Sequence, residues 1–178
     1  MPHYSPVSNN MIHSLLPSDF EAILKVINDA AQAYKGVIPD DRWKEPYMSA
    51  GELKEEIEAG VRFFGWVESG HLLGVAGIQA LKDTTLIRHA YVLPECQRKG
   101  IGKKLLEYLV GLAKTLEVLV GTWADATWAI RFYEKHGFKL VSSREKDRLL
   151  RTYWHIPERQ VETSVVLKTI SSFLGNRG

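Results

Sequence analysis

The stretch of the sequence best suited to chemistry runs from Tyr91 to Lys104, where an apolar segment gives way to glycines and basic residues. Gly100 and Gly102 mark the start of an expected helix, and free backbone N–H groups at a helix start bind anions. Glycine has no side chain that would keep a phosphate away from these groups. Four cations crowd the same helix start: Arg98, Lys99, Lys103 and Lys104. This pattern predicts a site for a phosphate or another polyanion.

The four cations are unfavourable at this position unless an anion joins them. Positive side chains at a helix N-terminus oppose the helix dipole, at a cost of about 0.3–1 kcal/mol each. A bound polyanion would reverse the sign of that contribution. The alternative is a solvated basic helix end, since runs of charge are often no more than exposed surface.

Two common phosphate-binding motifs fit this stretch poorly. A P-loop requires glycine five residues before its Gly-Lys pair and Ser or Thr after the Lys, and those positions hold Gln97 and Lys104. The dinucleotide fingerprint requires a third small residue where Leu105 stands, and a tighter turn after the strand. An NAD- or nucleotide-binding domain is therefore the weakest of the functional alternatives.

Two sequence blocks resemble one known superfamily. The segment from Gln97 to Gly102 (QRKGIG), which follows a strand ending at Pro94, resembles the central motif of the GNAT N-acetyltransferases. The segment from Ala129 to Phe138 (AIRFYEKHGF) resembles their C-terminal helix and turn. The resemblance is specific over residues 84–144 and consistent in element order over residues 11–167. Two motifs at the usual separation are stronger evidence than either alone.

The resemblance implies that the chain binds acetyl-coenzyme A (acetyl-CoA) as acyl donor. Backbone N–H groups over residues 98–103 would hold the pyrophosphate, and nearby basic side chains could also meet the 3′-phosphate. The end of the preceding strand, which usually carries a bulge in this superfamily, would pair with the pantetheine arm as with an added strand. The residues so implied are Ala90, Tyr91, Val92, Gln97, Arg98, Lys99, Gly100, Ile101, Gly102 and Lys103.

The implied reaction is transfer of the acetyl group from the thioester to a primary amine by direct attack. An alkyl ammonium has a pKa near ~10.4, so a base or a water relay must remove a proton before the amine can attack. A backbone N–H near Ala90 is the expected donor to the oxyanion. Tyr133 matches the recurrent helix tyrosine of the superfamily and is the implied acid for the leaving thiolate. Its alternative role is that of a core aromatic packed on the sheet.

The sequence identifies the general base less clearly than the general acid. Members of the superfamily often carry Glu near the start of the central strand, and this sequence has no acid between Asp83 and Ala90. His89 is the group there whose ordinary pKa suits base chemistry. A structural histidine bonded to a carbonyl, with ordered water as the base, is the alternative. A second departure is Ala126, which stands where members often have an Asn that contacts the coenzyme.

The resemblance places the amine acceptor opposite the coenzyme, near the loop between the first two helices and the final strands. Aromatic residues without core periodicity suit a ligand site, although loop packing or a contact in a homodimer suits them equally. The candidates are Tyr34, Trp43, Tyr47, Tyr153, Trp154 and His155. The acceptor could be a polyamine or amino sugar, an amino-acid-like metabolite, or a peptide amine. A non-catalytic acyl-CoA-binding or sensing module is the alternative function.

The composition is that of one globular domain that could position such a site. Of 178 residues, 45% are hydrophobic and 25% are charged, which excludes a disordered or collagen-like chain. A net charge of +2 is too balanced to predict bulk binding to nucleic acid or to a membrane surface. One cysteine, Cys96, cannot form an internal disulfide, and no ligand cluster predicts a metal site. We expect a cytoplasmic protein without a signal peptide or membrane span.

Hydrophobic periodicity predicts an α/β sandwich around one mixed central sheet. The resemblance implies that this is a GNAT-like fold, with helices on both faces of the sheet. Strands are expected over residues 11–15, 62–68, 72–81, 84–93, 118–123, 139–143 and 161–167, and helices over about 19–34, 49–60, 100–116 and 127–136. The last strand is expected to place Glu162, Ser164 and Lys168 on a solvated face. Flexible ends, residues 1–10 and 169–178, are expected around a domain over residues 11–168.

Overall fold

The computed structural model describes residues 11–170. The ends expected to be flexible fall outside this part, except for Thr169 and Ile170. The described residues form two compact units, the first built from residues 11–33, 44–80 and 87–112, the second from 34–43, 81–86 and 113–170.

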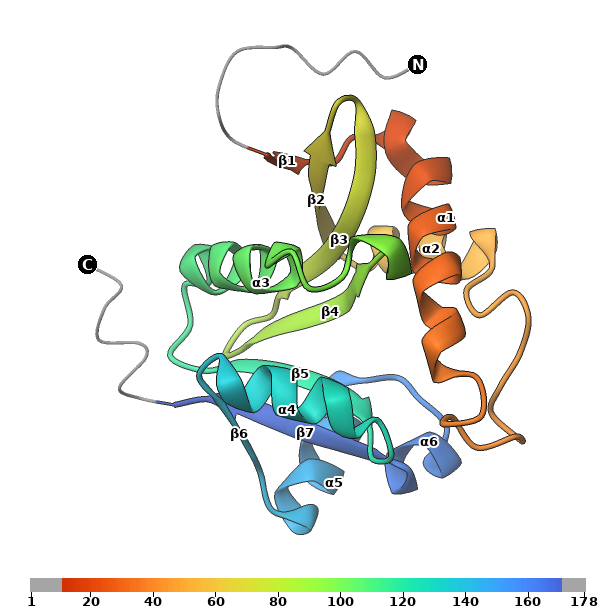
Figure 1. Ribbon diagram of the computed structural model, residues 1–178. Coiled ribbons are helices and arrows are strands. Elements are labelled where there is room, and N and C mark those ends of the chain that lie inside the picture. Colours follow the sequence, from red (N-terminus) through yellow and green to blue (C-terminus); the bar gives the residue numbers. More distant parts are fainter. Residues whose placement is uncertain (1–10, 171–178) are drawn as a thin grey trace. The chain divides into compact units, whose positions relative to one another are not determined.

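The first unit holds strands in the order β1-β2-β3-β4 (Figure 1). The strands are β1 (Ile12–Ser14), β2 (Arg62–Glu68), β3 (His71–Ala80) and β4 (Thr85–Val92). β1, β2 and β3 pair antiparallel. The β2–β3 turn has φ of 50° at Ser69 and 78° at Gly70, and such left-handed residues suit the twist of a tight hairpin. The strands expected over residues 62–68 and 72–81 therefore form a β-hairpin.

Helices cover both faces of the sheet in the first unit. They are α1 (Phe20–Ala31), α2 (Ala50–Glu58) and α3 (Ile101–Leu112). Successive residues of a strand point to opposite faces. A Cβ at Gly74 of β3 would lie 3.1 Å from Ile101 of α3, whereas the next residue, Val75, is buried in a cluster with Ile27 of α1 and Leu53 of α2. The alternation of β3 therefore separates α3 from α1 and α2.

Local sequence signals predict the start of α2 correctly but not the end of α3. Ser49 caps α2 as expected, since its side chain accepts the Glu52 N–H at 3.1 Å. α3 ends at Leu112, short of the predicted end, and Leu116 is 84% exposed rather than on an apolar face. The Thr115 hydroxyl donates to the Glu117 carbonyl at 2.8 Å, which favours a turn over a further helical turn.

The second unit holds strands in the order β5-β7-β6, paired antiparallel, and three helices. The elements are β5 (Val118–Trp123), α4 (Thr127–Lys135), β6 (Phe138–Leu140), α5 (Ser143–Tyr153), α6 (Glu158–Glu162) and β7 (Ser164–Thr169). The first residues of β4 belong to this unit, where the Thr85 N–H donates to the Glu117 carbonyl at 3.4 Å. With β4 beside β5 the sheet has seven strands, which confirms the expected fold class.

The chain after β6 differs most from the prediction. The strand expected over residues 139–143 is present but shorter, because β6 ends at Leu140 and α5 follows, with Ser142 as its N-cap. Val161, expected to begin the last strand, lies in α6. Ser164, expected on the solvated face, is buried, because β7 begins there and turns Ser164 to the same face as the core residue Val166. The alternation of apolar and polar residues that begins at Val161 therefore covers the end of α6 as well as β7.

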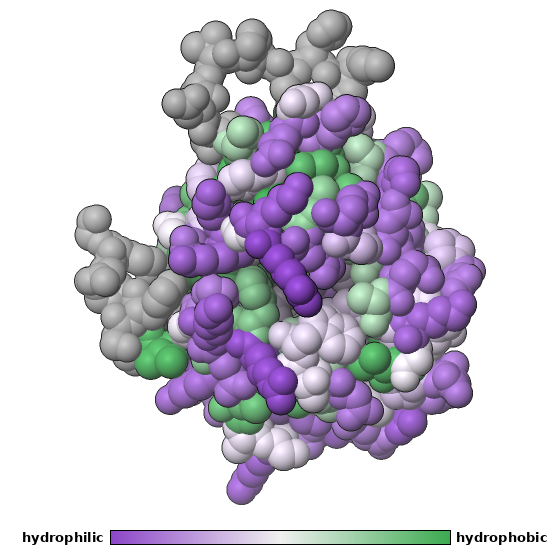
Figure 2. Space-filling view, in the orientation of Figure 1, coloured by the Kyte–Doolittle hydropathy of each residue, from purple (hydrophilic) through white to green (hydrophobic). Residues whose placement is uncertain are grey.

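The face drawn in Figure 2 is mostly hydrophilic, and its hydrophobic residues form small areas. Scattered apolar residues are normal on a protein surface and mark no site by themselves. Among residues 11–170, no helix is long and apolar enough to cross a membrane.

Candidate active site

The expected coenzyme-binding residues lie on consecutive segments of the first unit. Ala90, Tyr91 and Val92 end β4, a 3-10 turn covers Pro94–Cys96, and α3 begins at Ile101 (Figure 1). Three contacts hold the turn. The Leu93 N–H donates to the Leu73 carbonyl at 2.9 Å, the Cys96 N–H to the Leu93 carbonyl at 2.9 Å, and Gln97 Nε2 to the Val92 carbonyl at 3.3 Å.

The N-terminus of α3 has the features that a pyrophosphate requires. The first α-helical bond runs from the Lys104 N–H to the Gly100 carbonyl at 3.1 Å, so the N–H groups of Ile101, Gly102 and Lys103 have no acceptor within the helix. Gly100 has φ of 78°, and no atom lies within 4 Å of the place where its Cβ would be. An anion can therefore approach the backbone at Gly100 closely. These residues fit the diphosphate of coenzyme A.

Left-handed backbone also occurs at this turn. Arg98 has φ of 68°, in the left-handed region that residues other than glycine rarely adopt. Left-handed residues near a helix start can turn successive N–H groups toward a common anion. The strain at Arg98 and the left-handed Gly100 thus occur where the sequence predicts phosphate binding.

The basic side chains of this segment fall into two groups. Lys103 Nζ lies 3.8 Å from Glu107, and Lys104 Nζ lies 5.1 Å from the centre of the Trp66 ring, so both already face protein groups. All four side chains are exposed, and Arg98 and Lys99 lie in the turn directly before Gly100. These two cations are therefore the ones best placed to meet a phosphate.

His89 lies within β4 and has φ of 55°, a left-handed value that residues other than glycine rarely adopt. The bulge that the resemblance implies for this strand stays a prediction. The His89 ring stacks on Phe63 with 6.1 Å between centroids, and its Nε2 lies 3.1 Å from Oε2 of Glu56 in α2. A backbone irregularity and a carboxylate thus meet at the residue expected to act as base.

Glu56 has a second partner. Arg88 Nη2 donates to its Oε1 at 3.3 Å, and Arg88 Nη1 donates to Oε1 of Gln79 at 3.3 Å. Burial alone would raise the pKa of the Glu56 carboxyl, but the hydrogen bond with His89 and the charges of His89 and Arg88 outweigh it and lower that pKa. Burial lowers the pKa of the Arg88 guanidinium, and Glu56 opposes this shift. Glu56 is therefore an ionised carboxylate at neutral pH.

Sequence reasoning missed Glu56, because it searched for an acid on the central strand itself. The carboxylate comes instead from α2, across a separation of 33 residues. One signal could have indicated it. Glu56 lies three residues after Leu53, on the same side of the helix, and Leu53 is fully buried.

Tyr47, a candidate for contact with the acceptor, lies beside β4 in the first unit. The Tyr91 hydroxyl donates to the Tyr47 hydroxyl at 3.2 Å, and the rings meet edge to face. Asn28 of α1 holds the segment that carries Tyr47, since its side chain donates to the Met48 carbonyl at 2.9 Å and accepts the Met48 N–H at 2.8 Å. Tyr47 is thus fixed next to an expected coenzyme contact.

Tyr133, the expected acid, lies in α4 of the second unit. It is buried, and its ring meets Phe138 and Phe132 edge to face, with centroids 5.8 and 5.3 Å away. Burial, and to a lesser degree Tyr34, raises the pKa of the phenol, so its proton is retained at neutral pH. The residue therefore packs as a core aromatic and also carries a proton it could donate.

The other acceptor candidates belong to the second unit and differ in burial. Tyr34 packs on Trp128, with 5.2 Å between ring centroids, and Trp43 is half-buried. Trp154 is 8% exposed and packs on Gly121, in the core with Leu149. Tyr153 and exposed His155 flank it. The position of Trp154 matches the packing alternative, and we assign it no acceptor role.

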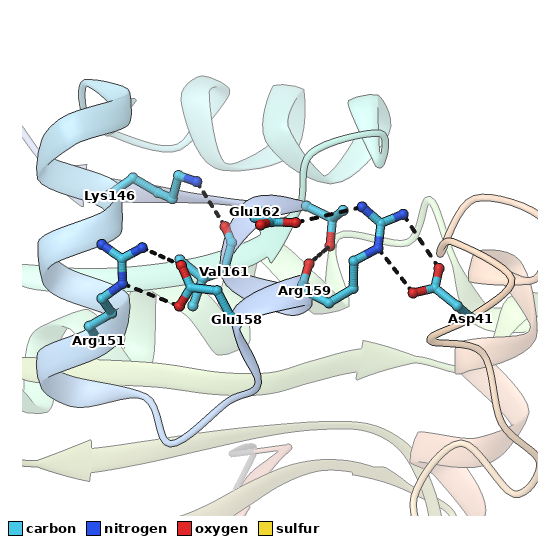
Figure 3. Close-up of polar contacts among 8 residues, drawn as sticks. Asp41, Lys146, Arg151, Glu158, Arg159, Val161 and Glu162 are labelled. Atoms are coloured by element: carbon cyan, nitrogen blue, oxygen red, sulfur yellow. Dashed lines mark hydrogen bonds and ion pairs between the residues drawn. The ribbon is translucent and has the colours of Figure 1, made fainter.

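Ion pairs on the surface of the second unit hold the loop that carries Trp43 (Figure 3). Arg159 Nε donates to Oδ2 of Asp41 at 3.0 Å, and this bond lowers the pKa of Asp41. The same guanidinium lies 3.9 Å from Glu162. The buried Lys146 of α5 donates to the Val161 carbonyl at 2.8 Å. These contacts tie α6 to the loop and to α5.

Between residues 11 and 170, no group of three or more His, Cys, Asp and Glu side chains could hold a metal ion.

Comparison with known proteins supports the functional reading. Residues 21–138, which hold both motif blocks, match the model of the Acetyltransferase (GNAT) family. The chain is 25% identical over 128 residues to the peptidyl-lysine N-acetyltransferase YiaC of Escherichia coli (strain K12). The aligned region covers 68% of this chain and 84% of that protein.

Solved structures of low sequence identity share the fold. PaiA N-acetyltransferase from Thermoplasma acidophilum, solved in complex with coenzyme A, has a TM-score of 0.66 at 21% identity, over 89% of this chain and 96% of that one. The ribosomal-protein-S18-alanine N-acetyltransferase from Escherichia coli has a TM-score of 0.62 at 18% identity, over 89% of this chain and 91% of that one.

Proposed function

Since the chain belongs to the Acetyltransferase (GNAT) family, and is thereby an N-acetyltransferase whose acyl donor is acetyl-CoA, we propose that it acetylates a primary amine by direct attack on the thioester. One observation carries the proposal. At the start of α3, N–H groups without a helical acceptor adjoin Gly100, whose open side admits a phosphate.

Residues of the first unit bind the coenzyme in this proposal. The N–H groups over residues 98–103 hold the pyrophosphate, and Arg98 and Lys99 neutralise phosphate charge. The buried Ile101 fixes the helix start against β3, so it contributes through its backbone. The end of β4, at Ala90 to Val92, pairs with the pantetheine arm.

Two side chains move the protons. The acceptor enters as an ammonium with three N–H bonds and leaves as an amide with one. His89 takes one proton and passes it to solvent, and the nitrogen then attacks the carbonyl carbon while an N–H near Ala90 donates to the oxyanion. As the C–S bond breaks, Tyr133 gives its proton to the sulfur and regains one from the second N–H. Each turnover therefore releases one proton.

We propose a peptide amine, in particular a Lys side chain, as the acceptor class to test first. The similarity to a peptidyl-lysine N-acetyltransferase supports this choice. Tyr47 lies beside Tyr91 at the coenzyme strand, where it can contact an acceptor. Tyr34, Trp43 and Tyr153 complete the acceptor candidates, and polyamines and amino sugars are the competing classes.

A screen of amines with acetyl-CoA and a free-thiol readout tests the proposal. We expect thiol release with at least one lysine-containing peptide, and we expect coenzyme A, but not NAD or ATP, to raise the melting temperature. Stabilisation by coenzyme A without turnover of any amine would instead indicate the acyl-CoA-binding module. Stabilisation by NAD or ATP alone would overturn the proposal.

A further inference from the structure

Glu56 and His89 form a pair that the reaction proposed above uses only in part. His89 Nε2 lies 3.1 Å from Glu56 Oε2, and their side chains are 16% and 22% exposed. The two residues come from different elements, α2 and β4. Burying a carboxylate this far is costly unless it is paired and hydrogen-bonded, so the position of Glu56 calls for a reason.

Neighbouring groups fix both members of the pair. Arg88 holds the second oxygen of Glu56 at 3.3 Å and is itself bonded to Gln79, whose amide donates to the Ala59 carbonyl at 3.0 Å. Phe63 of β2 lies against the His89 ring. Glu56 and Arg88 are thus the charged groups that face His89 from α2 and from its own strand, and Phe63 adds none.

The chemistry of the contact assigns a role to each ring nitrogen. An ionised carboxylate can only accept, so Nε2 of His89 must carry the hydrogen of this bond. In the neutral imidazole the lone pair then lies on Nδ1. We propose that Glu56 is a positioning residue for acetyl transfer, which fixes the His89 tautomer so that Nδ1 takes the proton from the amine. This inference rests on the proposed function.

The same contact stabilises the product of proton transfer. When Nδ1 is protonated, the imidazolium faces the Glu56 carboxylate, whose charge favours the cation. Arg88 opposes this effect, since its guanidinium is a like charge.

The decisive variant is Glu56→Gln, which keeps the shape of the side chain and removes its charge. We expect kcat to fall roughly 10- to 100-fold, because a positioned base contributes about 10²- to 10⁴-fold. We expect the KM for acetyl-CoA to stay within about twofold. Glu55→Gln, an exposed neighbour on α2, is the matched control and should change neither quantity.

Nitrogen NMR of the His89 ring tests the same idea without turnover. We expect the Nε2–H tautomer in the unaltered protein and in Glu55→Gln, and a mixture of tautomers in Glu56→Gln, whose amide can donate as well as accept. A dominant Nδ1–H tautomer in the unaltered protein, or a Glu56→Gln variant with unaltered kcat, would overturn the inference. Failure of the unaltered protein to acetylate any amine would refute the proposed function and, with it, the catalytic role of the pair. The NMR result would then still show whether the hydrogen bond forms.

Discussion

The coenzyme-binding segment and the acceptor candidates are built in different ways. The first consists of consecutive residues from β4 to α3, and the groups proposed to bind the coenzyme are mainly backbone N–H groups. The acceptor candidates are side chains on separate segments, among them Tyr47 before α2 in the first unit and Tyr153 at the end of α5 in the second. A backbone site depends on a short run of sequence, whereas a side-chain site depends on how distant elements pack. Substitutions in the two regions should therefore affect different properties of the protein.

The largest effect is expected at Gly100. A valine there would adopt a strained left-handed backbone and would fill the open space beside the helix start. We expect the Kd for coenzyme A to rise about 10³-fold, which corresponds to losing two charge-assisted hydrogen bonds of roughly 1.5–3 kcal/mol each. Calorimetric titration measures it. Gly111→Ala, at an open position within α3, is the control and should bind normally. Normal binding by Gly100→Val would remove this glycine from the coenzyme site.

Replacing Trp154 tests whether this residue belongs to the hydrophobic core or to the acceptor site. Because its ring is buried on Gly121, we expect Trp154→Ala to lower the free energy of unfolding by about 3–5 kcal/mol. Urea denaturation measures this change. His155→Ala, at the exposed neighbour, should leave stability within about 0.5 kcal/mol. A stable Trp154→Ala variant with a raised KM for the amine would return Trp154 to the acceptor site.

Tyr133→Phe separates proton donation from packing. The ring stays against Phe138, so stability and coenzyme affinity should hold within about twofold in Kd. We expect kcat to fall about 10²-fold, since general acid catalysis contributes roughly 10²- to 10⁴-fold. Steady-state kinetics with coenzyme titration measures both. Unchanged turnover would leave Tyr133 with its packing role alone.

Tyr47→Phe should have a smaller effect. It removes the hydroxyl that accepts from Tyr91, a bond of about 0.5–1.5 kcal/mol. We expect a KM for the amine that is about two- to tenfold higher, with an unchanged KM for acetyl-CoA. A rise in the KM for acetyl-CoA alone would indicate that Tyr47 supports coenzyme binding through Tyr91 and does not contact the acceptor.

The smallest effect concerns pH and stability. The folded-state pKa of Glu56 lies below its ordinary value of 4.5, so its stabilising contribution is present above that value and is lost as the pH falls through the lowered pKa. We therefore expect the stability difference between the unaltered protein and Glu56→Gln to shrink as the pH drops below 4.5. Thermal denaturation from pH 7 to pH 3 measures it. A difference that is constant over this range would contradict the assigned ionisation.

Most of the fold follows from local patterns in the chain. The strands β2, β3 and β5 and the helices α1, α2 and α4 lie close to their predicted bounds, because periodicity and end signals such as the Ser49 cap agree there. The prediction failed at α5 and α6. α5 buries only a narrow side, including Leu149 and Leu150, within a strongly charged segment, so its hydrophobic signal is weak.

The sequence by itself determined the β4–α3 junction, because glycine position, helix start and backbone N–H groups are properties of adjacent residues. It also indicated Tyr133 through the second motif. Only the tertiary structure decided that Glu56 faces His89, since the contact joins residues 33 apart and requires α2 to pack beside β4. It likewise decided that Trp154 is a core residue, because Gly121 leaves room for its ring. Side-chain partners across such separations are set by packing, which no local pattern encodes.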